Sequence, residues 1–203
     1  MATRTAAFFM LCYVFLKLNP LLSQDQIVEV IDQAKESYLE QSYQEASEQL
    51  SKALQLINDK LIDELKSAFP EPPGGWRANE AKGSVSGISS LSGLTVKRSY
   101  FKKGGGSSID IEMVTNSIKI GNIKMLFSSP SMVKRVDGKL KISTVADRNC
   151  LEKYDPVDRY AELIFVPTST LMVTIIGQDM KNTDTVLKIS EKVKWEDLEE
   201  IFP

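Results

Sequence analysis

Carboxylates are the residues of this 203-residue chain most capable of chemistry. Asp110 and Glu112 stand two apart in a run that alternates like a strand, and Asp147, Asp155 and Asp158 fall in expected turns. Paired carboxylates can hold calcium or serve as general acid and base. Their spacing does not match a calcium-binding loop, and acidic side chains are normally solvated. We therefore expect no metal site and no catalytic residue among them.

Other catalytic and nucleotide-binding patterns are missing too. The chain contains no histidine, the commonest general base and metal ligand. In KKGGGSS, residues 102–108, the lysines precede the glycines and a strand is expected to follow, the reverse of a phosphate-binding loop. The net charge of −2 gives no overall basic character for nucleic acid. We predict that the protein is not an enzyme and has no cofactor and no nucleic-acid partner.

Residues 1–23 are typical of a targeting segment. Arg4 precedes AAFFMLCYVFL, residues 6–16, an apolar run of signal-peptide length that is short for a membrane span. The cleavage signal after it is imperfect, so an uncleaved N-terminal anchor is the alternative. We expect an exported protein, periplasmic or secreted, that contacts a membrane only if this segment is retained. Cleavage would remove Cys12 and leave Cys150 as the only cysteine.

Residues 24–68 have the period of two amphipathic helices. Apolar side chains recur every three or four residues on both sides of a break near Gln41 and Ser42, which predicts an antiparallel helical hairpin. The hairpin resembles one tetratricopeptide repeat, and the residues that fit the repeat are Ala34, Tyr43, Ala46, Leu50 and Ala53. A single repeat does not bury its faces. We therefore expect the hairpin to pack on the C-terminal domain or on a second subunit.

The stretch FPEPPGGW, residues 69–76, directly follows the hairpin. Its prolines end the helix and keep the chain extended, and its two glycines permit a sharp turn. We interpret residues 69–83 as a hinge between two units. Trp76 is then the first large apolar side chain of the second unit, expected to dock on its core, with a partner contact as the alternative.

Residues 84–203 are expected to form an α+β domain. LTVKRSYF and IDIEMV alternate around KKGGGSS, which predicts a β-hairpin. ELIFV and LMVTIIG are rich in β-branched residues and predict a central antiparallel pair. A helix broken near Pro130, a further strand pair and a C-terminal helix complete the pattern. Strand pairs and helices without regular βαβ alternation indicate an antiparallel sheet.

The order of these segments resembles a family of exported bacterial proteins of uncharacterised function. The resemblance covers roughly residues 40 to 203 and is carried by PEPPGGW, VKRSY and MLFSSPSM, in that order. It implies a C-terminal domain similar to the PsbP-like α/β sandwich, and it supplies no catalytic residues. In ISSLSGLTV this chain has less glycine than the family usually carries.

Two functions are compatible with these patterns. The first is a non-catalytic exported protein-interaction module with a protein partner or self-association. The alternative is a carrier of a small apolar molecule or lipid, held between helix and sheet. Met125, Phe127 and Met132 are the candidate pocket wall. Together with Trp76 they make up the candidate ligand or partner surface.

Overall fold

The computed structural model describes residues 26–86 and 93–203. The chain divides into two compact units between Lys60 and Leu61. The first contains a helical hairpin and the second a sheet domain. Within the described ranges, no helix is both long and apolar enough to cross a bilayer. The targeting segment predicted over residues 1–23 lies outside them.

The hairpin consists of a helix over residues 26–39 and the first part of α2 (Tyr43–Ser67). The first helix ends in a Schellman motif, in which the amide of Ser42 donates to the carbonyl of Ser37 at 2.9 Å. Gln41 adopts the left-handed conformation that the motif requires, with φ at 65°. The predicted hairpin and the place of its turn are confirmed.

The final turns of α2 belong to the sheet domain. Leu65 and Ala68 are fully buried in its core. Gly83 lies so close to Ile62 that a Cβ at this position would collide with the isoleucine side chain. The structure therefore divides the chain within α2, earlier than the boundary that the sequence placed after residue 68.

Eight strands of the described residues form one antiparallel sheet, so the α+β class is confirmed. From one edge the order is β1 (Trp76–Ala78), β3 (Gly93–Lys102), β4 (Ser108–Thr115), β8 (Leu171–Gln178), β7 (Tyr160–Phe165), β6 (Arg148–Asp155) and β5 (Leu140–Val145). β2 (Lys82–Ser86) also pairs with β3. The three predicted strand pairs are β3–β4, β5–β6 and β7–β8, and β4 joins β8.

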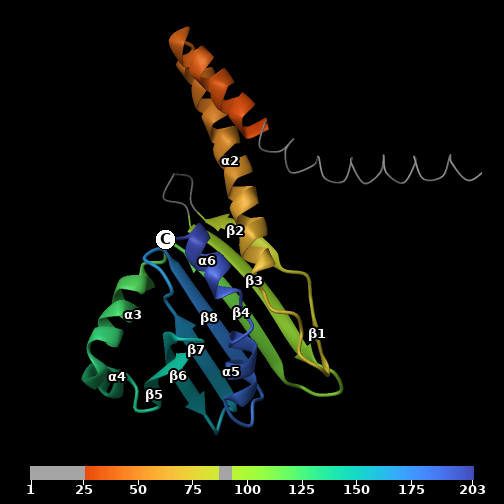
Figure 1. Cartoon of the computed structure of the whole chain (residues 1–203), viewed down its shortest axis with the longest axis vertical. Helices are drawn as coiled ribbons and strands as arrows, with labels where there is room; N and C mark the ends of the chain where they lie inside the picture. The colour runs from red at the N-terminus through yellow and green to blue at the C-terminus, as the bar shows by residue number, and fades with distance from the viewer. Residues whose placement is uncertain (1–25, 87–92) are drawn as a thin grey trace, which may run out of the picture. The chain divides into compact units, whose positions relative to one another are not determined.

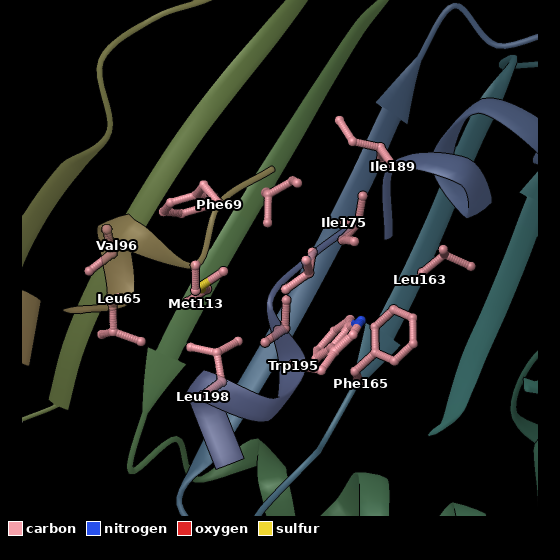
Figure 2. Packing of buried hydrophobic residues seen from close by; sticks show 14 of the residues in the cluster. Leu65, Phe69, Val96, Met113, Leu163, Phe165, Ile175, Ile189, Trp195 and Leu198 are labelled. Carbon is pink, nitrogen blue, oxygen red and sulfur yellow. The ribbon is translucent and has the colours of Figure 1, made fainter. Parts of the chain in front are cut away.

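Helices α5 (Asp184–Ser190) and α6 (Trp195–Ile201) cover one face of the sheet (Figure 1). Figure 2 shows Trp195 of α6 beside Phe165 of β7, and their ring centroids lie 4.7 Å apart. The close approach of α5 requires Gly177 on β8, because a Cβ there would lie 2.7 Å from a methyl carbon of Val186. The predicted C-terminal helix and final helical turn are both present.

Two further helices, α3 (Lys119–Ser128) and α4 (Pro130–Val136), pack beside β6 and β5. Pro130 opens α4, where the missing N–H costs no helical hydrogen bond. The helix predicted to break at this proline is confirmed.

Residues 69–83, interpreted from the sequence as a hinge, are tied to the sheet. Phe69 is buried, and the carbonyl of Pro70 accepts hydrogen bonds from the Tyr100 hydroxyl at 2.8 Å and from Nη1 of Arg98 at 3.2 Å. β1 and the beginning of β2 lie within this segment and pair with β3. The segment is thus part of the edge of the sheet.

Replacing Leu65 with alanine should lower the free energy of unfolding by about 2–5 kcal/mol, the range for a buried leucine. The exposed Leu39 is the matched control, and Leu39→Ala should change it by less than about 0.5 kcal/mol. Urea unfolding of the full chain, followed by tryptophan fluorescence, measures both. Equal losses would contradict the assignment of the end of α2 to the core.

Candidate functional site

Two of the five carboxylates singled out in the sequence, Asp110 and Asp155, make side-chain contacts within the sheet domain. Asp110 and Glu112 share one face of β4, and Asp110 accepts a hydrogen bond from Ser99 on β3. Asp155 forms an ion pair with Lys139, whose hydrogen bond lowers the pKa of this carboxyl. In the described ranges, no three His, Cys, Asp or Glu side chains are grouped to hold a metal ion.

Glu152 is a buried carboxylate that sequence reasoning did not single out. Ser143 donates a hydrogen bond to it at 2.6 Å, and Nζ of Lys141 lies 3.1 Å away. Burial raises the pKa of Glu152, but hydrogen bonds from Ser143, Lys141 and Thr183 outweigh burial and hold the pKa below its usual value. The ionised carboxylate of β6 is therefore held by two residues of β5, Ser143 and Lys141.

Cys150 lies on the same face of β6 as Glu152, and its side chain is buried. Burial raises the pKa of Cys150 to about 12, and the negative charge of Glu152 adds to the shift. Because the thiolate is the nucleophilic form, this thiol is unreactive near neutral pH. Cys150 is a packed core residue.

Of the three residues expected to form a pocket wall, only Phe127 lines a cleft described here. The cleft is open and has a volume of about 450 Å³. Its lining consists of Lys124, Phe127, Ser128, Arg148, Asn149, Val166 and Pro167. Met125 is 51% exposed, and Met132 is also exposed. The lining of this cleft is mixed, with two cationic side chains beside its apolar residues.

Arg148, one of the residues that line this cleft, is bound by other side chains of the protein. Its guanidinium makes a bidentate ion pair with Glu199, with N–O distances of 2.6 and 2.9 Å. A third contact reaches Glu196 at 3.3 Å, and the group lies 5.6 Å from the ring centroid of Trp195. These contacts hold α6 against β6 and neutralise most of the charge that an anionic ligand would seek.

Trp76, the remaining candidate, lies on the edge strand β1 opposite Lys102. Its ring is half-buried and packs against the core of the sheet domain. One part of the indole therefore supports the fold, and the other part remains accessible to solvent.

The helical hairpin buries small side chains and exposes large ones. Its buried residues are Val30, Ala34, Ser37, Ala46 and Ala53. We define the apolar flank as the exposed residues Ile31, Tyr38, Tyr43, Leu50 and Ile57. Tyr38, Tyr43 and Leu50 are 63%, 60% and 55% exposed. This arrangement reverses the usual preference for large apolar residues in the interior.

The apolar flank occupies one side of the hairpin. Around the axis of the first helix, Ile31 lies about 100° from the buried Val30. Around the axis of α2, Leu50 lies about 40° from the buried Ala46, and each helix is viewed from its N-terminus, so the two rotations have the same sense. In an antiparallel pair of helices, equal senses of rotation bring both residues to the same side. The rings of Tyr38 and Tyr43 confirm this side, because they meet edge to face across the turn at 5.6 Å between centroids.

The opposite side of the hairpin is mostly acidic, with Lys52, which precedes the buried Ala53, as a basic residue among the acids. The acidic residues that directly precede a buried residue are Glu29, Glu36 and Glu45. On the side of the apolar flank, α2 carries the uncharged Ser47 and Ser51, and the first helix carries Lys35. In the first helix an acid, a buried residue and an apolar residue follow one another twice, at residues 29–31 and 36–38. This order is a sequence signal from which the division could have been predicted.

Comparison with known proteins gives no match, since no family model fits the chain and no curated protein or solved structure is significantly similar to it. The arrangement of side chains is therefore the basis for any functional proposal. Among the surfaces described here, the apolar flank is the one whose residue types and exposure suit an interaction with another macromolecule.

The lowered pKa of Glu152 predicts that the stability of the folded protein depends on pH. The folded pKa of Glu152 lies below the usual value, so on acidification the unfolded chain takes up the proton first. The stability that Glu152 contributes is present above pH about 4.3, the ordinary glutamate pKa, and is lost as pH falls through the folded value. Urea unfolding at pH 7 and pH 3.5 should show a smaller loss for Glu152→Gln than for the native chain. Identical losses would contradict this role.

Replacing Trp76 with alanine should lower the free energy of unfolding by up to about 3 kcal/mol, the low end for a large aromatic, because the ring is only half-buried. Phe101→Ala, at an exposed aromatic on the neighbouring strand β3, is the control and should cost less than about 1 kcal/mol. Thermal denaturation compares the two variants. An unchanged melting temperature for Trp76→Ala would leave the indole free for a partner.

Proposed function

We propose that the protein is a non-catalytic, exported protein-interaction module that binds its partner through the apolar flank. The observation that carries this proposal is the exposure of Tyr38, Tyr43 and Leu50 on one side of the hairpin, where Lys35 is the one charged neighbour described. Depletion of charge and enrichment in tyrosine are characteristic of the centres of protein interfaces. Export is supported by Arg4 and the apolar run over residues 6–16.

The sheet domain serves in this proposal as a stable base with a PsbP-like sandwich fold, an assignment that rests on PEPPGGW and MLFSSPSM. A non-catalytic role is supported by the contacts of its reactive groups. Glu152 is ionised and bound by Lys141, and Cys150 is buried with a raised pKa. These groups stabilise the domain instead of facing a substrate.

A carrier of a small apolar molecule is the weaker proposal. The cleft beside Phe127 has a volume within the range of ligand pockets, but it is open and Lys124 and Arg148 contribute to its lining. An apolar molecule would be poorly enclosed there. The exposed tyrosines and Leu50 of the hairpin offer a more uniform apolar surface.

A photo-reactive amino acid placed at Leu50 tests the proposed function in cells that naturally produce the protein. We expect a discrete protein adduct, identified by mass spectrometry, because position 50 is at the centre of the apolar flank. The same probe at Gln55, an exposed position elsewhere on α2, is the matched control and should give no adduct. Equal labelling from both positions, or none from either, would contradict a specific docking role for the flank.

A further inference from the structure

The two helices of the hairpin bury little apolar volume between them. The residues between the two helices are mostly alanines, with Val30 as the one large aliphatic side chain among the buried residues described. A pair of helices with so little buried volume gains little from the hydrophobic effect. The large apolar side chains of the hairpin therefore contribute to its stability only when another element covers them.

The spacing of the apolar flank points to a helical occupant. Tyr43, Leu50 and Ile57 are seven residues apart along α2, and Ile31 and Tyr38 have the same spacing on the first helix. A seven-residue repeat forms a straight apolar seam when helices pack at a small crossing angle. Two such seams side by side match the packing of a four-helix bundle.

The distribution of charge on the hairpin limits which kind of molecule could cover the apolar flank. The acidic side of the hairpin, with Glu29, Glu36 and Glu45, would attract a basic partner away from the apolar flank. Lys35 alone does not supply the basic border with which interfacial helices bind anionic membranes. An uncharged seam is complementary to itself, because two copies can meet without placing like charges opposite each other.

The exposed area is in the range that self-association requires. With about half or more of Tyr38, Tyr43 and Leu50 accessible, the flank offers several hundred Å² of apolar surface. A standard interface buries roughly 800 Å² on each partner. The flank with its border can supply an interface at the lower end of that range, so the association should depend on concentration.

We infer that the occupant of the apolar flank is the same flank of a second copy of this chain, and that the two hairpins form a four-helix bundle. The inference rests on the proposed function and names its partner. Leu50, halfway between Tyr43 and Ile57, lies at the centre of the contact. The interface is isologous, so each flank meets its own equivalent.

Sedimentation velocity of the full chain over a hundredfold range of concentration tests this inference. The native chain should pass from monomer to dimer, and Leu50→Glu should weaken self-association at least tenfold because it buries a charge in an apolar contact. Gln55→Glu adds the same charge outside the flank and should dimerise like the native chain. Tyr38→Glu should repeat the effect of Leu50→Glu, and far-UV circular dichroism checks that each variant keeps its helices.

The outcomes separate the inference from the proposed function. A dimer unaffected by both Leu50→Glu and Tyr38→Glu would place self-association elsewhere and overturn the inference. So would a native chain that stays monomeric throughout. If that monomer still forms a discrete adduct with a different protein through the probe at position 50, the proposed function stands and the partner is a different chain. If a variant loses its helices, the purified native chain carrying the probe at position 50 decides, because the inference requires an adduct between two copies.

Discussion

The apolar face of the antiparallel sheet must be covered, and the second unit is organised around that requirement. The end of α2 and the two C-terminal helices meet over this face, and the backbone itself joins them. The amide of Lys194 donates to the carbonyl of Ala68 at 3.2 Å, and the next carbonyl but one, of Pro70, accepts from Tyr100 and Arg98. In FPEPPGGW the chain thus passes from helix to sheet edge with the carbonyls of Pro70, Pro73 and Gly75 accepting hydrogen bonds. Proline suits this passage because it brings no N–H that would need a partner.

The helix α2 consequently packs in two different environments along its length. In the first unit, α2 contributes Ala46 and Ala53 to a thin contact with the preceding helix, and Leu50 is left exposed. In the second unit, Leu65 of the same helix is fully buried in the core (Figure 2). The helix carries apolar side chains along its length, but among the described residues only its final turns are packed into the core of the sheet domain. This difference in covering separates the part that stabilises the fold from the part available for recognition.

Local patterns predicted most of the elements. Alternation identified β3 and β4, β-branched runs identified β7 and β8, and the break at Gln41 and Ser42 identified the helical turn, because each depends on neighbours in sequence. Contacts between distant residues could not be predicted in this way. The bonds from Tyr100 to Pro70 and from Arg148 to Glu199 join segments that only the sheet order brings together. The same limit applied to the candidate site. Periodicity showed that Leu50 is on an apolar face, but it could not show that the other described residues leave Leu50 exposed.

The charged and reactive groups of the sheet domain are largely committed to one another. Arg148 is held by Glu199, Lys153 by Asp137 and Glu152 by Lys141. A ligand that recruited any of these groups would have to break an existing contact, which offsets much of what the new one contributes. Binding to the apolar flank would break no such contact, because a partner that covers the flank displaces only water. The proposed recognition through the hairpin would therefore cost the domain little stability, and a covering helix would complete a core that the two helices cannot fill by themselves.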